Sequence, residues 1–293
     1  MASVSTVIPT HNRPGRVLEA IKSVREQTLP VDELLLVNDG SSIDYSSVRE
    51  ELDAFGSKTV TKFLETDGEG AAKARNVGAS ESSGDILMFL DDDDRWHSTK
   101  VERQMALLND SHGLVYSGRL AVGDNGSPLY TIDGDAMGDL KDEILTTNRI
   151  GTTSSVAVNT DLFESISGFD VEMPALQDWE LWIRLCQHTA VIYDPEHTVE
   201  WTIHSNGSQM ADDHRLYAKA VARIEEKHNL LFNRLSWRDR RRARAYRHQV
   251  VASKRPETSP RRYLDLSQSL VNWPTLSAAA AFLPDTVVQR LRT

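Results

Sequence analysis

Four consecutive aspartates, Asp91 to Asp94, are the residues whose type and spacing most directly indicate chemistry in this chain. They follow an apolar run, Ile86 to Leu90, which predicts a buried strand over 85–90. Adjacent like charges repel one another, and a divalent cation relieves that repulsion because hard cations prefer carboxylate oxygens. An open α/β sheet binds ligands at the carboxyl ends of its strands. The pattern therefore predicts a metal site at this strand end; the alternative is an acidic, solvated loop.

Polar residues also stand at the ends of two other predicted elements. Asp39 stands at the end of the predicted strand 33–37, whose residues 34–37 are apolar, and its carboxylate is suited to accept hydrogen bonds from a nucleobase or a ribose hydroxyl. The alternative is an aspartate that orders its own turn beside Gly40. Lys73 and Arg75 lie within one turn near a predicted helix start, which favours a phosphate. Solvated surface cations are the other interpretation of that pair.

Two residues in the second part of the chain carry groups that catalysis uses. Asp178 begins a predicted helix and is either the N-cap of that helix or a carboxylate that the preceding loop, 168–170, delivers to a cleft. His204 follows a predicted strand over 199–203. A lone histidine there is either a metal ligand or an ordinary polar residue.

The elements that must position these residues alternate strand and helix over the first 117 residues. This order predicts an α/β fold with a mostly parallel sheet and helices on both faces. Beyond it, Asn125-Gly126 predicts a hairpin between 120–122 and 129–132, and the chain from 213 onward is predicted to be helical. Strands are expected at 4–8, 33–37, 59–64, 85–90, 114–116, 153–158, 191–193 and 199–203, and helices from Pro14 and at 45–55, 70–80, 100–108, 161–166, 179–186, 213–229, 236–252, 260–271 and 275–292.

Size and composition are those of an ordinary folded protein. The 293 residues are 40% hydrophobic and 26% charged, which suits one large or two small domains. The single cysteine, Cys186, excludes a disulfide within the chain and a cysteine metal cluster, and we expect it to be a core residue. The first residues show no basic and apolar signal, and no apolar run reaches a membrane-spanning length. The expected location is the cytoplasm.

Five segments in order along the chain carry a joint pattern: 7–13, 37–42, 70–78, 89–96, and 168–170 with 178–182. Together they resemble the family 2 glycosyltransferases, which use nucleotide sugars and have the GT-A fold, over roughly residues 3–208. The Asp-rich segment stands where that family has its DXD motif. The resemblance implies a Rossmann-like, mostly parallel sheet in a transferase domain over 1–210, with a nucleotide-sugar half over 1–117, an acceptor half over 118–210 and a helical extension over 211–293.

The resemblance also implies a role for each matching residue. Thr10 and Asp39 would hold the nucleobase, Arg75 would lie near the nucleotide, Asp91 and Asp92 would contact ribose and sugar, Asp93 would coordinate Mg²⁺ or Mn²⁺ at the diphosphate, Asp178 would be the general base, and His204 would complete the metal site. One position departs from the pattern, because Gln177 stands where the family often has glutamate. That departure puts the acceptor contacts of the glutamate in doubt.

The implied reaction is inverting, metal-assisted, hexosyltransferase-type transfer from a nucleotide-diphosphate sugar to an acceptor hydroxyl, in glycan or polysaccharide assembly. The acceptor would be a sugar or a lipid-linked sugar. A nucleotidyltransferase on a similar fold is one alternative, but residues 9–15 lack the glycine-rich, basic loop that triphosphate binding needs. A non-catalytic nucleotide-sugar-binding protein is the other, and the joint presence of Asp39, Asp91–Asp93 and Asp178 argues against it.

The charge of the chain is unevenly distributed. Residues 1–233 carry 20 Lys and Arg against 39 Asp and Glu, whereas residues 234–262 carry 11 against 2. Seven arginines crowd one predicted helix and its approach, with Trp237, Trp273 and the apolar run 276–283 nearby. These residues suit peripheral docking on the anionic inner face of a membrane. Pairing of the arginines with the acidic body is an equal alternative, and nucleic acid is a lesser one.

Overall fold

The structure is a computed structural model that describes residues 2–109, 112–204 and 213–275, together with residues 279 and 282. The predicted domain boundary at 210 falls in 205–212, outside the described residues, so it stays a prediction, as does the division at 117. The chain divides into two compact units. The first comprises 1–140, 150–171 and 184–203, and the second comprises 141–149, 172–183 and 204–293.

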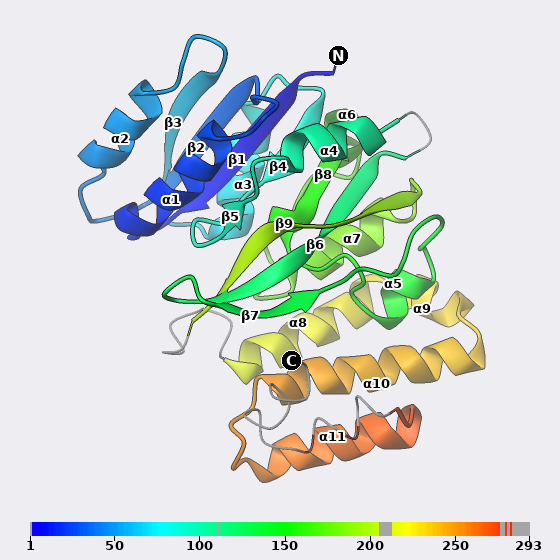
Figure 1. The fold of residues 1–293 in the computed structure, drawn as a ribbon. Coiled ribbons are helices and arrows are strands. Elements are labelled where there is room, and N and C mark those ends of the chain that lie inside the picture. The colour runs from blue at the N-terminus through cyan, green and yellow to red at the C-terminus, as the bar shows by residue number, and fades with distance from the viewer. Residues whose placement is uncertain (1, 110–111, 205–212, 276–278, 280–281, 283–293) are drawn as a thin grey trace. The chain divides into compact units, whose positions relative to one another are not determined.

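In the described residues of the first unit, nine strands form one sheet in the order β3-β2-β1-β4-β8-β6-β9-β5, with β7 paired to β6 (Figure 1). The first four strands in this order are parallel, and β6 and β9 are also parallel. The other pairs are antiparallel. The strands are β1 Val4–Thr10, β2 Glu33–Asp39, β3 Val60–Thr66, β4 Ile86–Phe89, β5 Arg95–Trp96, β6 Leu114–Gly123, β7 Pro128–Ile132, β8 Val156–Asn159 and β9 Val191–Ile203.

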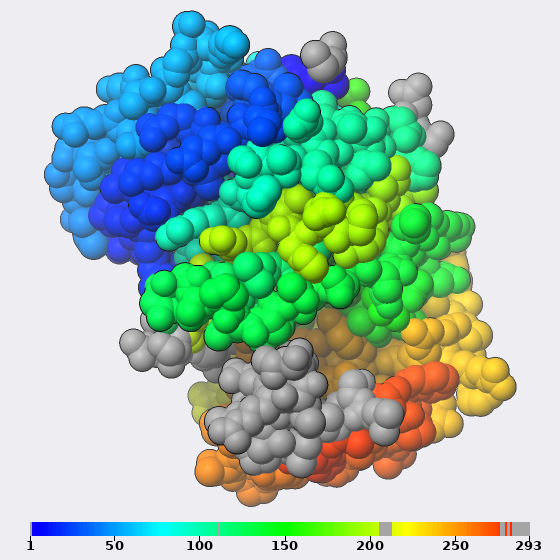
Figure 2. All heavy atoms as spheres, in the orientation of Figure 1, coloured from blue at the N-terminus to red at the C-terminus, as the bar shows by residue number. Residues whose placement is uncertain are grey.

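Helices cover both faces of the parallel part of the sheet, as predicted. Alternate residues of a strand point to opposite faces. On one face, Ile8 and Leu36 share a buried cluster with Val17 of α1. On the other face Gly78 of α3 lies so close to Val7 that an added Cβ would meet its Cγ1 at 2.4 Å. All residues of β1 and β2 are buried, and Figure 2 shows the outer surface of this part of the chain in blue. The helices of this unit are α1 Pro14–Arg25, α2 Ser46–Asp53, α3 Ala71–Ser80, α4 Lys100–Leu107, η1 Thr153–Ser155 and α6 Thr160–Ser165.

The strand order creates a switch point beside β1. The chain runs from β1 to β2 and β3 on one side and then returns to β4 on the other side. Loops that leave β1 and β4 in different directions open a crevice between them, where such sheets bind ligands. Thr10 ends β1, Asp39 ends β2 and the aspartate tract follows β4. The residues that the sequence singled out in the first unit therefore gather at one edge of the sheet.

Several elements differ from the sequence prediction. The strand predicted at 153–158 is instead the 3₁₀ helix η1 followed by β8, and the strands predicted at 114–116 and 120–122 are both part of β6. The strands predicted at 191–193 and 199–203 form a single strand, β9, of 13 residues. The polar segment with Pro195 suggested a break, because proline cannot donate to a strand ladder. The structure instead keeps β9 continuous with register shifts against β6 around Gly118, and the fully buried Asp194 stays in the strand because Arg103 of α4 donates to it at 2.6 Å.

The second unit is helical in the described residues. Its helices are α5 Glu143–Thr146, most of α7 Gln177–Leu185, α8 His214–Lys227, α9 Asn229–Arg234, α10 Trp237–Ser253 and α11 Pro260–Asn272. The helices predicted over 213–229, 236–252 and 260–271 are therefore confirmed, whereas the helix predicted over 275–292 lies almost wholly outside the described residues. In Figure 1, α10 and α11 lie side by side. Every helix in the described part of the chain is too short or too polar to cross a membrane.

Candidate active site

Thr10, at the end of β1, and Arg13, in the loop after it, contact the aspartate tract. The Thr10 hydroxyl donates to Asp92 Oδ2 at 2.8 Å and lies 2.9 Å from the Tyr45 hydroxyl. Arg13 Nη1 lies 3.2 Å from Asp92 Oδ1 and 3.0 Å from Asp93 Oδ2. These contacts involve the carboxylates of Asp92 and Asp93, and Arg13 forms an ion pair with both of them. The switch point of the sheet therefore holds a charged, hydrogen-bonded cluster.

Burial and repulsion act together on Asp92. The side chain is only 9% exposed. The pKa of Asp92 is raised to about 6, first by burial and then by the neighbouring charge of Asp93, against the lowering effects of Arg13 and of the Thr10 hydrogen bond. Ionised Asp92 is thus electrostatically strained, and an added cation nearby would favour the ionised form.

Asp94 fixes the other end of the tract. Its carboxylate accepts from the Ser154 hydroxyl at 2.6 Å and from the Thr202 backbone N–H at 3.1 Å. The Thr202 hydroxyl donates to the Asp93 carbonyl. Burial, followed by the charges of Asp91 and Asp93, holds the pKa of Asp94 well above its usual range. Asp94 therefore ties the tract to η1 and β9.

Arg75 of α3 reaches the first aspartate of the tract. Its Nη2 forms an ion pair with Asp91, which also accepts from the Thr153 hydroxyl at 3.2 Å. The guanidinium lies 5.4 Å from the centre of the Phe169 ring. Arg75 is only 8% exposed, and its buried Nε finds no partner among the described residues. A buried donor without a partner is costly, so the site presents an unsatisfied N–H beside Asp91.

Asp39 is engaged by the loop that precedes α3. Its carboxylate accepts from the Thr66 hydroxyl at 2.7 Å and from the backbone N–H groups of Glu69 and Gly70 at 3.0 and 2.7 Å. An ionised carboxylate has about four acceptor positions, so one remains. Asp39 therefore orders the loop before α3, whereas the alternative from the sequence placed it in its own turn beside Gly40. The nucleobase role stays a prediction.

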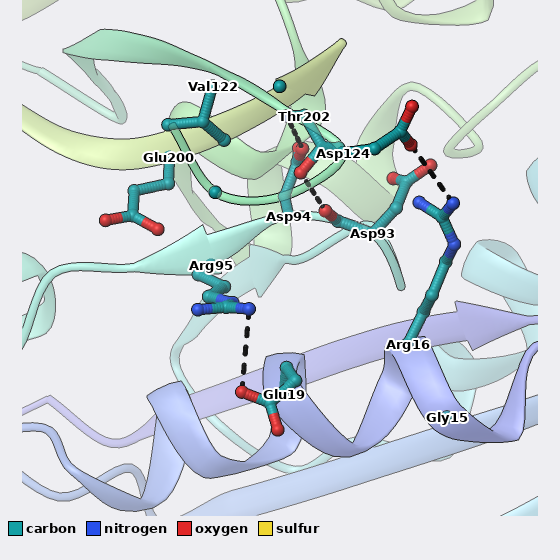
Figure 3. A pocket seen from close by; sticks show the side chains of 12 residues that line it. Gly15, Arg16, Glu19, Asp93, Asp94, Arg95, Val122, Asp124, Glu200 and Thr202 are labelled. Atoms are coloured by element: carbon teal, nitrogen blue, oxygen red, sulfur yellow. Dashed lines mark hydrogen bonds and ion pairs between the residues drawn. The ribbon is translucent and has the colours of Figure 1, made fainter. Parts of the chain in front are cut away.

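A polar pocket with a volume of about 230 Å³ opens beside Asp93 and Asp94 (Figure 3). Elements α1, β5, β9 and the β6–β7 hairpin line it. In Figure 3, Arg16 reaches toward Asp124 of the hairpin, at 3.2 Å, and Arg95 reaches toward Glu19 of α1, at 3.5 Å. The pocket gives a ligand access to the tract from the side of α1.

Asp178 and His204 belong to the second unit. Asp178 is half-buried, and its Oδ1 accepts from the Trp179 backbone N–H at 2.7 Å. It is the second residue of α7 and not its N-cap, because Leu176 precedes the helix. His204 is half-buried. Within the described residues, no three histidine, cysteine or acidic side chains are grouped so as to hold a metal ion.

Sequence reasoning missed several residues that shape the site. Arg13 follows the β1 end, so its place beside the tract was open to prediction from the strand order. Ser154 and Thr202 gave no signal, because they lie 60 and 108 residues from Asp94 in the chain. Cys186 is confirmed as a core residue, and burial raises the pKa of its thiol to about 12.

Comparison with known proteins identifies the family. The model of the family described as Glycosyl transferase family 2 matches residues 5–162. This chain belongs to glycosyl transferase family 2. It is 27% identical over 230 residues to an uncharacterized glycosyltransferase of Haemophilus influenzae, covering 76% of each chain. It is also 27% identical over 233 residues to one from Rickettsia bellii, but that match covers 74% of this chain and only 32% of the relative.

Two solved structures share the fold. The mannosyltransferase PcManGT from Pyrobaculum calidifontis, in complex with GDP-Man and Mn²⁺, superposes with a TM-score of 0.62 at 18% identity, covering 98% of this chain and 80% of that one. Residues 1–349 of S. aureus TarS, in complex with UDP-GlcNAc, superpose with a TM-score of 0.58 at 16% identity, covering 98% and 92%. The predicted GT-A fold with C-terminal helices is confirmed.

The raised pKa of Asp92 predicts a pH-dependent stability effect. The cost of ionising this buried carboxylate is absent below its unfolded pKa near 3.9, grows as the pH rises and is complete above about 6. Asp92→Asn removes that cost while keeping an oxygen that accepts from Thr10. We expect it to raise Tm relative to the wild type by more at about pH 7.5 than at about pH 4.5, measured calorimetrically in EDTA. An equal Tm difference at both pH values would contradict this assignment.

Proposed function

We propose that this chain transfers a sugar from a nucleoside diphosphate sugar to an acceptor hydroxyl, with inversion at the anomeric carbon. The observation that carries the proposal is the aspartate tract, held at the switch point of the sheet by Thr10 and Arg13 beside the buried Arg75. Membership of family 2 supports the transferase class. The donors bound by TarS and PcManGT, UDP-GlcNAc and GDP-Man, are the first sugar nucleotides to test.

Within this proposal the loops after β1 and β2 hold the nucleotide. Asp39 has an acceptor position left for a nucleobase N–H. The Thr10 hydroxyl is hydrogen-bonded to Asp92 and Tyr45. We therefore propose that the Thr10 side chain contributes to nucleotide binding by holding Asp92 in position. Asp91 and Asp92 face ribose and sugar hydroxyls, and the unpartnered Nε of Arg75 suits a phosphate or hydroxyl oxygen of the donor.

The donor set fits a divalent metal that takes most of its ligands from the substrate. Mg²⁺ is usually bound through one or two carboxylates plus substrate phosphates and water, so the lack of a three-residue cluster in the described residues agrees with such a site. We propose Asp93 as the protein ligand, with His204 as a second. A bound Mg²⁺ or Mn²⁺ would stabilise the charge of the nucleoside diphosphate leaving group. Arg13 also places a positive charge beside the Asp93 carboxylate.

The proposed base is Asp178. It would accept the proton of the acceptor hydroxyl while that oxygen attacks the anomeric carbon on the face opposite the leaving group. That geometry inverts the configuration and needs no covalent sugar–enzyme intermediate. A hexose donor and a role in glycan or polysaccharide assembly complete the proposal.

We also propose that the adjoining ends of α10 and α11 bind an anionic membrane surface. Trp237 and Val271 are 64% and 70% exposed. The Arg238 guanidinium lies over the Trp237 ring at 5.4 Å, and Arg241 donates to the Val271 carbonyl at 2.6 Å, so basic and apolar groups share one surface. Each basic residue near anionic lipid contributes roughly 1 kcal/mol. Arg247 does not belong to this surface, because it is buried and paired with Glu225.

Asp93→Ala should abolish sugar transfer and leave the fold intact, because a carboxylate at a strand end is not part of the apolar core. EDTA should inhibit the wild type, and added Mn²⁺ or Mg²⁺ should restore it. Activity is measured as nucleoside diphosphate released from UDP-GlcNAc and GDP-Man. Full activity in EDTA, or in the Asp93 variant, would rule out the metal proposal.

Asp178→Asn is nearly isosteric and should preserve donor binding. It should lower the catalytic rate by ~10²–10⁴-fold, the usual effect of losing a general base. Donor affinity by calorimetry and turnover by nucleotide release separate the two effects. Parallel loss of binding and activity would mean that Asp178 is a structural residue and that another group is the base.

The full chain should co-sediment with vesicles that contain phosphatidylserine at low salt, and high salt should release it. Arg238→Glu together with Arg241→Glu should abolish this binding. Arg215→Glu, an exposed arginine of α8, is the matched control and should leave binding unchanged. Equal binding by the double variant, or no binding by the wild type, would remove the membrane proposal.

A further inference from the structure

The first turn of α7, which carries Asp178, is anchored by a buried carboxylate two residues further on. Glu180 is fully buried in the second unit. Lys227 Nζ lies 2.8 Å from Glu180 Oε1, and His228 Nε2 lies 3.1 Å from the same oxygen. Lys227 is the last residue of α8, and His228 follows it. Glu180 therefore joins the start of α7 to the end of α8.

Burying the Glu180 carboxylate costs free energy, so the groups that compensate its charge restrict where the start of α7 can lie. Moving a carboxylate out of water costs several kcal/mol unless cations and hydrogen-bond donors compensate. Lys227 and His228 supply that compensation for Glu180 from one helix end. Removing Lys227 would take a cation away from this buried carboxylate, and the first turn of α7 would shift or hydrate in response. The orientation of this turn thus depends on α8.

A second anchor holds the residue between Asp178 and Glu180. The Trp179 ring is fully buried, and its Nε1 donates to the Ile144 carbonyl of α5 at 2.8 Å. The ring of Tyr246 of α10 meets it edge to face, with centroids 5.1 Å apart. Both partners belong to the second unit. Three helices, α5, α8 and α10, therefore hold the two residues that follow Asp178.

The backbone conformation directly before α7 also indicates that surrounding contacts hold this turn in place. Leu176, directly before α7, has a φ of 57°, which is unfavourable for a residue with a branched side chain. Such a conformation persists only where surrounding contacts determine it. The Glu180 backbone N–H donates to the Leu176 carbonyl at 3.0 Å, so the anchored residue closes the turn that contains the strained one.

We propose that Glu180 and Lys227, with His228, are positioning residues for Asp178, an inference that rests on the proposed role of Asp178 as the base. Residues two apart in a helix point to nearly opposite sides. The Glu180 side chain is buried and points toward Lys227 and His228 at the end of α8, whereas the Asp178 side chain is only half-buried. The ion pair fixes the rotation of the first turn of α7 and so the direction in which the Asp178 carboxylate points. The C-terminal helices are therefore part of the catalytic apparatus.

Lys227→Met tests this proposal, because Lys227 sits at the rim of the contact and its side chain is 35% exposed. We expect kcat to fall ~10–100-fold, since a displacement of about 1 Å can cost 10²-fold. KM and the affinity for UDP-GlcNAc or GDP-Man should stay within about twofold of the wild type, because the donor residues lie on other elements. Lys219→Met, the same change at an exposed position of α8, is the matched control and should leave kcat unchanged.

The decisive comparison repeats Lys227→Met in the Asp178→Asn background. If Lys227 acts through the base, the second substitution should lower kcat by less than about twofold there, because no base remains to be positioned. An equal fall in both backgrounds, or an unchanged kcat in the single variant, would overturn the proposal. If Lys227→Met does not fold, Glu180→Gln serves in its place, because it keeps the shape and an accepting oxygen and removes only the charge.

The outcomes also separate this inference from the function on which it rests. Full kcat in Asp178→Asn alone would remove the proposed base, and the positioning role with it. A slow Asp178→Asn enzyme combined with a fully active Lys227→Met enzyme would remove only the positioning role. Amide hydrogen exchange of residues 177–183 gives a readout besides activity: Lys227→Met should speed exchange there, and Lys219→Met should not.

Discussion

Mutual repulsion among four adjacent carboxylates is the constraint on which the first unit of this protein depends. The fold compensates this repulsion by placing partners from different elements beside three of the aspartates. Asp92 receives a hydroxyl and a guanidinium from the loop after β1, and Asp94 is bound by η1 and β9. Asp91 is paired with Arg75 of α3. Burial, and after it the charge of Asp93, raises the pKa of Asp92 to about 6, and a bound cation would favour the ionised form.

Much of this arrangement could be predicted from local patterns. The apolar runs of β1, β2 and β4 fix which residues stand at strand ends, and parallel strands bring those ends to one edge. The partners of the tract could not be predicted in the same way. Ser154 and Thr202 reach Asp94 across 60 and 108 residues of sequence, and single hydroxyl or backbone groups leave no periodic signal. The continuity of β9 was missed for a related reason, since contacts with β6 and α4 outweigh the local effect of Pro195.

The second unit shows where sequence patterns are ambiguous, at the proposed base Asp178. An aspartate at a helix start fits an N-cap as well as a general base, and the spacing alone does not separate them. The structure removes the N-cap interpretation, because Leu176 stands before the helix and Asp178 is its second residue. The pairing of Glu180 with the end of α8 was not predicted, because it joins residues 48 positions apart. Basic residues of the second unit thus occur both in ion pairs with a buried member and at the exposed surface.

Calorimetric titration of the full chain with UDP and with GDP, in Mn²⁺ and then in EDTA, tests the central claim most directly. The claim is that the strained tract at the end of β4 binds a nucleoside diphosphate together with a divalent cation. The account predicts saturable binding of one of the two nucleotides in Mn²⁺ and at least roughly tenfold weaker binding in EDTA, a difference of about 1.4 kcal/mol. Equal affinity with and without the metal, or no binding of either nucleotide in Mn²⁺, would contradict it.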